Sequence, residues 1–272
     1  MIKTKEKIKK PDVEKYFRRY LRIGPLALAL WRSVEAKHLS RVPLKHPILD
    51  IGCGFGEFAV AYADEQIDMG IDLSSRDLYY AAKTKKYKNL TLGDARDLPF
   101  ADNSYASIFS ISTLEHIPNS DKVLQEAYRV LKPGGVIFLT LETDEVDGAT
   151  FYRPLMKKMG LSGVSNLTSK MYNNLFHRHT LLPKKDWKKK MQKAGFVIET
   201  YQDIISPQVN KLFDIWLITA WPSMILKPFV GKRVVFRPKF MEDLLTKQFL
   251  KYVAEEETEG TNLLIIARKP LK

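Results

Sequence analysis

Short apolar runs alternate with amphipathic stretches along most of the chain from residue 48 onward. Short apolar runs bounded by turn residues are typical of buried strands, and apolar residues at helical spacing are typical of helices. Strands are expected at 48–51, 67–74, 90–95, 105–113, 136–143, 197–204 and 261–270, and helices at 57–66, 76–87, 121–131 and 183–196. This alternation predicts an α/β fold with a doubly wound, mostly parallel seven-stranded sheet that carries helices on both faces.

Other stretches precede or interrupt this alternation. Residues 12–40 carry an apolar stripe at helical spacing, so we predict an N-terminal helical cap over 1–40, ahead of a main domain over 41–272. Two inserts, 145–182 and 207–258, are long for loops, and loops of that length usually carry structure or function of their own. We expect them to form a helical lid over the carboxyl edge of the sheet, where open α/β sheets bind ligands.

One apolar segment of the second insert, residues 212–231, is about as long as a membrane span. Asp214 and Lys227 lie inside it and Pro222 breaks it, so it does not read as a transmembrane helix. Its two tryptophans and flanking lysines favour an interfacial segment, or an apolar lid around a hydrophobic substrate. The alternative is ordinary packing of an extra helical layer.

The composition adds an excess of positive charge. The 272 residues carry a formal net charge of +13, which favours an anionic partner such as nucleic acid or an acidic membrane surface. The alternative is that the lysine runs, such as 83–88 and 184–190, are only solvated faces. The single cysteine, Cys53, excludes an intramolecular disulfide, and no signal peptide is apparent at the N-terminus. We therefore expect a cytoplasmic protein, peripheral at most to a membrane.

The sequence ILDIGCGFGEF predicts a strand, a tight glycine turn and a helix N-terminus over residues 48–58. Such a turn points backbone N–H groups and the positive end of a helix dipole at a ligand. Gly52, Gly54 and Gly56 make G-x-G-x-G, whereas the dinucleotide pattern G-x-G-x-x-G would need its third glycine at Glu57. The turn therefore favours a nucleotide-like cofactor other than a dinucleotide.

Three aspartates raise the weight of this turn. Asp72 and Asp94 are expected at the ends of two neighbouring strands, where a carboxylate can accept hydrogen bonds from a ribose. Asp50 lies two residues before the first glycine, where it would repel a pyrophosphate but attract an ammonium or sulfonium group. The alternative for Asp72 and Asp94 is N-capping of the helices that follow.

Five segments in order, ILDIGCGFGEF, GIDLS, GDARDLPF, SISTLEHIP and LKPGG, resemble the class I S-adenosylmethionine-dependent methyltransferases, especially the ubiquinone and menaquinone biosynthesis branch. The resemblance covers residues 45–143 well and 197–204 and 261–270 loosely. It implies a Rossmann-like fold that binds S-adenosylmethionine and releases S-adenosylhomocysteine. The motifs are specific for the cofactor and much less so for the methyl acceptor.

The resemblance also implies a set of cofactor-binding residues. Those that would frame the methionine part of the cofactor are Asp50, Gly52, Gly54 and Gly56, with the backbone of Ser110 near its amine. Asp72 would hold the ribose hydroxyls and Leu73 would lie against the adenine. Asp94 would bond the adenine amino group, and the backbone N–H of Ala95 would bond a ring nitrogen.

Catalytic candidates are fewer. A hydroxyl acceptor gains from a base, and His116 is the best candidate by position, with Glu115 second. His177 and His179 lie in the first insert and are weaker candidates for the base or the lid; for all four a structural role is the alternative. Some quinone O-methyltransferases of this branch carry E-x-x-E-H, but Ser112 replaces the first acid here, so two ligands remain and we predict no metal.

The apolar inserts and the positive charge favour O-methylation of a small amphiphilic or lipid-linked acceptor at or near an anionic membrane surface. RNA methylation at a ribose or ring carbon is an alternative, and nucleic acid is the less favoured partner. The N/D-P-P-Y motif of exocyclic-amine methylases is absent after the fourth expected strand. A non-catalytic relative of the fold, which binds a partner but no cofactor, is a further alternative.

Overall fold

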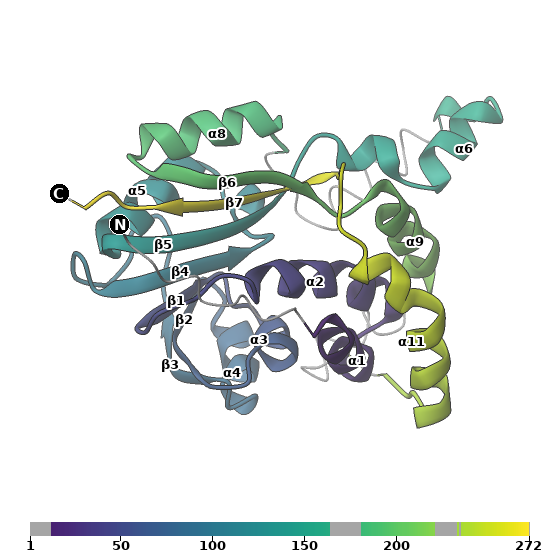
Figure 1. The fold of residues 1–272 in the computed structure, drawn as a ribbon, viewed down its shortest axis with the longest axis horizontal. Coiled ribbons are helices and arrows are strands. Elements are labelled where there is room, and N and C mark those ends of the chain that lie inside the picture. The colour runs from purple at the N-terminus through teal and green to yellow at the C-terminus, as the bar shows by residue number, and fades with distance from the viewer. Residues whose placement is uncertain (1–11, 164–180, 221–232, 234, 272) are drawn as a thin grey trace, which may run out of the picture.

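The computed structural model describes residues 12–163, 181–220, 233 and 235–271. Its centre is a seven-stranded sheet in the order β3-β2-β1-β4-β5-β7-β6, and only β7 runs antiparallel to its neighbours (Figure 1). The strands are β1 (Ile48–Ile51), β2 (Ile67–Asp72), β3 (Tyr87–Leu92), β4 (Tyr105–Ile111), β5 (Leu131–Glu142), β6 (Val197–Ile204) and β7 (Asn262–Arg268). The predicted fold class is confirmed.

Both faces of the sheet are buried, as expected for parallel strands. Alternate residues of a strand contribute to different apolar clusters: Leu49 and Ile108 belong to one, and Ile48 and Phe109 to the other. Helices α5 and α8 cover the first face, and α2, α3 and α4 the second (Figure 1). Their bounds are α2 (Leu26–Leu39), α3 (Glu57–Tyr62), α4 (Ser75–Lys83), α5 (Ser120–Val130) and α8 (Lys184–Lys193).

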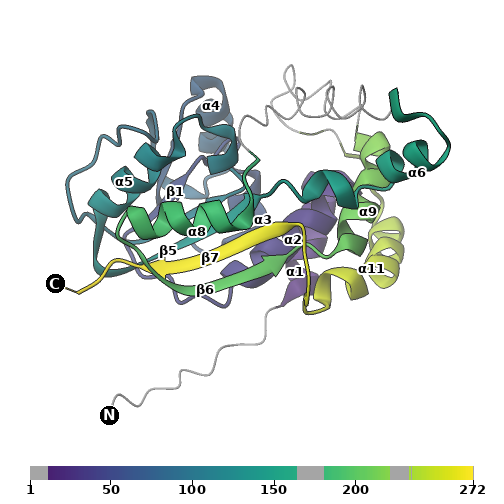
Figure 2. The same ribbon diagram turned by 90° about the horizontal axis from the view of Figure 1, so that it is seen from above.

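Further helices stand beyond the carboxyl ends of the parallel strands (Figures 1 and 2). They are α1 (Val13–Ile23), α6 (Tyr152–Lys158), α9 (Pro207–Leu217) and α11 (Lys239–Ala254), with the short 3-10 helices η2 (Val146–Ala149) and η3 (Ile218–Ala220); a third 3-10 helix, η1 (Leu114–His116), follows β4. We call α1, α2, α6, α9 and α11 the cap.

The stretch 12–40 is helical as predicted, in two helices, because Gly24 and Pro25 separate α1 from α2 and proline disfavours helix in the residue before it. Some predicted boundaries in the main domain were wrong. The third strand begins at Tyr87 and ends at Leu92, so Asp94 lies beyond it. The third strand can begin earlier than expected because α4 ends at Lys83 and not at residue 87.

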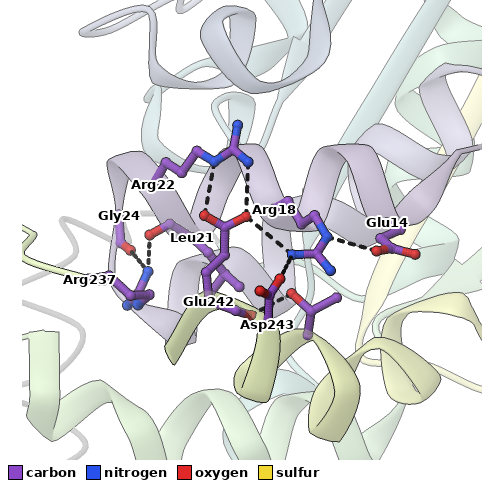
Figure 3. Close-up of polar contacts among 9 residues, drawn as sticks. Glu14, Arg18, Leu21, Arg22, Gly24, Arg237, Glu242 and Asp243 are labelled. Carbon is purple, nitrogen blue, oxygen red and sulfur yellow. Dashed lines mark hydrogen bonds and ion pairs between the residues drawn. The ribbon is translucent and has the colours of Figure 1, made fainter. Parts of the chain in front are cut away.

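An ion-pair cluster joins the first and last helices of the cap (Figure 3). Glu242 of α11 accepts hydrogen bonds from Nε and Nη2 of Arg22 at 2.9 and 3.0 Å, and from Nη1 of Arg18 at 3.3 Å. The hydrogen bonds from Arg22 lower the pKa of Glu242. Because Glu242 is almost fully buried, its charge depends on these arginines for compensation, and the cluster fixes α11 against α1.

The apolar segment 212–231 is only partly described. Residues 212–220 complete α9 and form η3, whereas the rest, including Pro222 and Lys227, lies outside the described residues. In the described part of the chain, no helix has the length and apolar character needed to cross a membrane.

Candidate active site

Three alternate glycines form a tight turn between β1 and α3 at the carboxyl edge of the sheet. Gly52, Gly54 and Gly56 all have positive φ, at 80°, 50° and 73°. The carbonyl of Ile71 in β2 accepts the backbone N–H groups of Gly52 and Cys53 at 2.9 and 3.1 Å. The turn is therefore fixed to the neighbouring strand immediately before α3 begins.

Gly52 and Gly54 differ in the space that a side chain would occupy at each position. A Cβ atom on Gly52 would lie 2.2 Å from Cγ2 of Thr113, and the positive φ disfavours any other residue there. A Cβ atom on Gly54 would meet no atom within 4 Å, so the space beside it is open. A ligand can therefore approach the backbone closely at Gly54.

Asp72 connects the glycine turn to the end of β2. Its Oδ2 accepts the N–H of Gly54 at 2.8 Å, and its Oδ1 accepts the N–H of Ser74 at 2.9 Å. The N-cap of α4 is Ser74, whose hydroxyl oxygen accepts the N–H of Asp77, so Asp72 does not cap that helix. Leu73, between them, has 70% of its surface exposed and is available to pack against a ligand.

Asp94 is held by an arginine that sequence reasoning missed. Both carboxylate oxygens accept Nε of Arg96 at 3.0 Å, and Oδ2 also accepts Nη2 at 2.6 Å. These hydrogen bonds lower the pKa of Asp94. The segment that follows is a turn, not a helix, so N-capping does not explain Asp94 either.

Asp50 is the most perturbed carboxyl of the cofactor candidates. It is buried, and its Oδ2 accepts a hydrogen bond from the hydroxyl of Tyr87 at 2.7 Å. Burial raises its pKa to about 7, the hydrogen bond from Tyr87 opposes this shift, and the negative charge of Asp72 adds to it. Asp50 is therefore poised to ionise near neutral pH.

Two cavities meet at this edge, and Gly52 and Thr113 line both. The first, of about 290 Å³, lies between the glycine turn and helices α1 and α2. The second, of about 190 Å³, lies at the ends of β2 and β3 beside η1. Of the predicted cofactor residues, Asp50, Gly52 and Gly54 line the first cavity, and Gly52, Asp72, Leu73, Asp94 and Ala95 line the second.

The inner wall of the first cavity comes from the N-terminal helices. Arg32 donates from Nη1 to Oε2 of the buried Glu35 at 2.8 Å, and the hydroxyls of Ser112 and Thr140 donate to Oε1 of Glu35 at 2.7 and 2.8 Å. The hydroxyl of Tyr20 is buried and has no hydrogen-bond partner among the described residues. Burial raises the pKa of Tyr20, so this hydroxyl stays protonated and can donate to a ligand.

Tyr20 and Arg32 carried no signal in the sequence, because they belong to no motif and look like ordinary polar positions of amphipathic helices. Only the packing of α1 and α2 beside the glycine turn brings them to the cavity. Arg233 also lines it and donates to Glu57 at 3.2 Å.

The four catalytic candidates are placed differently. His116 lines the second cavity. Glu115 is fully buried and lines neither cavity; its Oε1 accepts the N–H of Glu142 at 3.1 Å. Burial and the nearby charge of Glu142 raise the pKa of Glu115 to about 8, so it is protonated at neutral pH. His177 and His179 lie outside the described residues.

Other predicted residues have structural contacts. The hydroxyl of Ser110 donates to the carbonyl of Ile51 at 2.7 Å and is fully buried, and the cavity wall begins with the next residue, Ile111. Gly56 is the N-cap residue of α3. Burial raises the pKa of the Cys53 thiol, so it is unreactive. Within the described ranges, no three His, Cys, Asp or Glu side chains gather as a metal site would require.

Residues 49–139 match the model of a family described as a methyltransferase domain. The range includes the glycine turn, Asp72, Asp94 and η1. It excludes Tyr20, Arg32 and the rest of the N-terminal wall of the first cavity.

The proteins that resemble the chain include two curated methyltransferases and one solved structure. Demethylmenaquinone methyltransferase of Bacillus licheniformis is 31% identical over 156 residues, which cover 53% of this chain and just under two thirds (66%) of that protein. The ubiquinone/menaquinone biosynthesis C-methyltransferase UbiE of Rickettsia felis is 27% identical over 64% of this chain and 77% of its own. Phosphoethanolamine N-methyltransferase 2 of Haemonchus contortus, in complex with S-adenosyl-L-methionine, superposes with a TM-score of 0.52 at 23% identity, over 94% of this chain and 56% of its own.

Proposed function

We propose that this chain methylates an oxygen atom of a small amphiphilic or lipid-linked acceptor. It is a class I S-adenosylmethionine-dependent methyltransferase, and ubiquinone and menaquinone methyltransferases are among its relatives. The observation that carries this proposal is the mixed wall of the first cavity. Ile23, Leu28 and Phe58 are apolar, whereas Arg32 and Asp50 are charged. A cavity lined in this way suits an acceptor with an apolar body and a polar reacting end.

The cofactor is S-adenosylmethionine, and when bound it supplies an electrophilic methyl group on a sulfonium centre. We assign its adenosine part to the second cavity, where Leu73 offers an exposed apolar surface. The open space beside Gly54 and the acidic Asp50 suit its cationic methionine part. Asp94 can accept a hydrogen bond from an adenine amino group if that group shares or displaces Arg96.

The remaining task of the protein is to orient the acceptor and to exclude water. We propose that Tyr20 and Arg32 bind anionic or hydrogen-bonding groups in the first cavity, because one is a buried donor and the other a partly buried cation. For the base we retain His116, although it lines the second cavity, which we assign to the adenosine part, so it would have to act where the two cavities meet at Gly52 and Thr113. Glu115 lines neither cavity and is protonated at neutral pH.

Label transfer tests the proposal. The protein is incubated with methyl-labelled S-adenosylmethionine and cell extract, and label is counted in the lipid, RNA and polar small-molecule fractions. Asp72→Asn should remove the transfer, because the amide has one acceptor oxygen and no negative charge. It therefore cannot accept the N–H groups of Gly54 and Ser74 with two oxygens as the carboxylate does. Asp64→Asn, at an exposed aspartate away from both cavities, is the matched control and should retain it.

The fractions decide between the alternatives. Label in the organic phase, on an oxygen atom after hydrolysis and mass analysis, supports the proposal. Label on a ring carbon would keep the lipid-linked acceptor but overturn O-methylation. Label confined to RNA or to polar small molecules would overturn the acceptor class, and binding of S-adenosylmethionine without transfer to any fraction would favour a non-catalytic relative.

A further inference from the structure

Exposed apolar side chains gather on the outer end of the cap. Ten of the fifteen large apolar side chains that are exposed among the described residues lie either between 151 and 161 or between 218 and 244. Both stretches belong to the two inserts, and Figures 1 and 2 place α6 and α11 at the same end of the molecule, beyond the sheet, with α6 at the top and α11 at the bottom of that end in Figure 1. Concentration of this kind marks an interaction surface.

Helix α6 is part of this surface and has no buried residue. Its N-terminal turn is tied to the body by Asp214 of α9, whose Oδ2 accepts the backbone N–H groups of Phe151 and Tyr152 at 2.9 Å. Residues 151–161 include Lys157 and Lys158 and no acidic residue. Exposed apolar residues interspersed with cations alone are typical of a helix that lies at the interface of an anionic membrane.

The start of α11 has the same character. Phe236, Phe240 and Leu244 follow one another at a spacing of one helical turn and have 91%, 70% and 59% of their surface exposed. Phe240 and Leu244 lie in α11, each two residues from the buried Glu242 and therefore on a different side of the helix, whereas Phe236 precedes the helix. Helix α11 is held in place from its other side, so these side chains are not exposed merely because the end of the helix frays.

The contacts between the opposite side of α11 and helix α1 also determine the charge of this surface (Figure 3). Glu242 and Asp243 are the acids of the stretch 236–244, and both are paired with α1: Arg22 and Arg18 bind Glu242, and Arg18 donates to Asp243 at 2.6 Å. Arg18 also pairs with Glu14 at 2.7 Å, so two guanidinium groups face three carboxylates here, and the small positive excess of this surface comes from Arg237 and Lys239. The surface is thus apolar and cationic at both α6 and α11.

The start of α11 lies beside the first cavity. Nη1 of Arg237 donates to the carbonyls of Leu21 and Gly24, and the bond to Gly24 measures 3.2 Å (Figure 3). Gly24 and Arg233 both line that cavity. Phe236, next in sequence to Arg237, is therefore close to the cavity where the acceptor is proposed to bind.

We propose that residues 151–161 and 236–244, which we call the cap tip, dock on the surface of a lipid bilayer that contains anionic lipids. The apolar side chains enter the interface and the cations meet the lipid headgroups. The proposal rests on the proposed function, because docking here would bring the acceptor cavity next to the membrane that contains a lipid-linked acceptor.

Sedimentation with vesicles tests the cap tip. The full chain is mixed with phosphatidylcholine vesicles with and without about one third phosphatidylglycerol. We expect binding to the anionic vesicles, and a loss of about tenfold or more in partition coefficient for the triple variant Phe236→Ser, Phe240→Ser, Leu244→Ser. The matched control is Val197→Ser with Leu271→Ser, two exposed apolar residues away from the cap tip, and it should bind as the wild type does.

A charge variant and a folding check complete the experiment. Lys157→Glu with Lys158→Glu should weaken binding to anionic vesicles and leave any binding to neutral vesicles unchanged. Unchanged calorimetric binding of S-adenosylmethionine by every variant shows that each one is folded.

Several results would overturn the docking proposal: no binding of the wild type to either vesicle, or equal binding by the triple variant and the wild type. A dimer in analytical ultracentrifugation that the triple variant converts to a monomer would show that the cap tip covers a second copy. The two proposals can fail separately. Transfer to a detergent-dispersed lipid acceptor without vesicle binding refutes docking alone, and vesicle binding with label only in polar molecules refutes the acceptor class alone.

Discussion

Changing the pH between 8 and 6 should change the affinity for S-adenosylmethionine, through the ionisation of Asp50. This carboxyl lines the first cavity, and burial raises its pKa to about 7. The methionine part of the cofactor carries positive charge, which an ionised carboxylate attracts and a protonated one does not. Binding should therefore strengthen as the pH rises through 7 and should be accompanied by release of a proton.

The magnitude follows from the pKa. With a value of about 7, roughly 90% of Asp50 is ionised at pH 8 and roughly 9% at pH 6. If only the ionised form attracts the cofactor, the apparent dissociation constant rises about tenfold from pH 8 to pH 6. Titration calorimetry at pH 6, 7 and 8, at constant ionic strength and in two buffers of different ionisation enthalpy, measures both the affinity and the proton release.

Two variants isolate the contribution of Asp50. Asp50→Asn keeps the size of the side chain but cannot ionise, so the pH dependence should shrink to that of the cofactor's own amino group. Tyr87→Phe removes the hydrogen bond that favours the ionised form, so the midpoint should move to higher pH. The reasoning is refuted if wild type and Asp50→Asn lose affinity equally between pH 8 and pH 6.

The same shift has a consequence for stability. The pKa of Asp50 is raised in the folded protein from its ordinary value of 3.8, so the folded state binds more protons than the unfolded state between these values. Stability therefore falls as the pH rises from about 4 to about 7, by about 4 kcal/mol for a shift of this size. Urea unfolding across this range should show that the wild type loses about 4 kcal/mol more than Asp50→Asn, because the contribution of Glu115, whose pKa is also raised, is common to both proteins.

Other substitutions give separate tests. Gly52→Ala should lower the thermal midpoint and the free energy of unfolding by about 1–3 kcal/mol, because its Cβ would meet Thr113 at 2.2 Å; Thr113→Ser in the same chain should restore part of the loss, and no loss would contradict the close packing. Glu242→Gln should cost about 1–3 kcal/mol at pH 7, because Arg22 loses its charged partner; the difference should shrink as the pH falls below the ordinary pKa of 4.5 and through the lowered pKa that Glu242 has in the folded state. Glu115→Gln should stabilise the protein above pH 8 relative to the wild type, because the wild type must ionise a buried carboxyl whose pKa is about 8; equal unfolding curves at pH 9 would contradict this.

Local sequence signals predicted much of the sheet and of the glycine turn. Buried parallel strands are continuous apolar runs, and Gly52 and Gly54 stand out because few other residues tolerate that backbone. The order of strands was not readable in the same way. That β7 inserts between β5 and β6 depends on pairing between residues such as Leu139 and Ile265, which are far apart in the sequence.

The charged residues were harder to interpret than the apolar ones. Lysine runs suggested either solvated faces or an anionic partner, yet Lys37 is fully buried and donates to Glu257 at 2.8 Å and to the carbonyl of Glu255 at 2.6 Å. Lys184 similarly bonds Glu145 and Asp203, at 2.6 and 2.8 Å. Part of the cationic excess therefore connects segments of the fold, and a formal charge of +13 is a poor measure of the charge available to a partner.

The separation between the family match and the cap suggests where acceptor specificity resides. The matched range 49–139 holds the glycine turn and the whole of the second cavity, whereas Tyr20, Arg32 and Arg233 enter the first cavity from outside it. Helix α1 packs Phe17 and Leu21 into the same apolar cluster as the sheet, so Tyr20, between them, is held firmly against the cavity. If the second cavity holds the adenosine part, as proposed, the residues of the motifs lie on the cofactor side and the walls contributed by the cap lie on the acceptor side, so the motifs carry little information about the molecule that receives the methyl group.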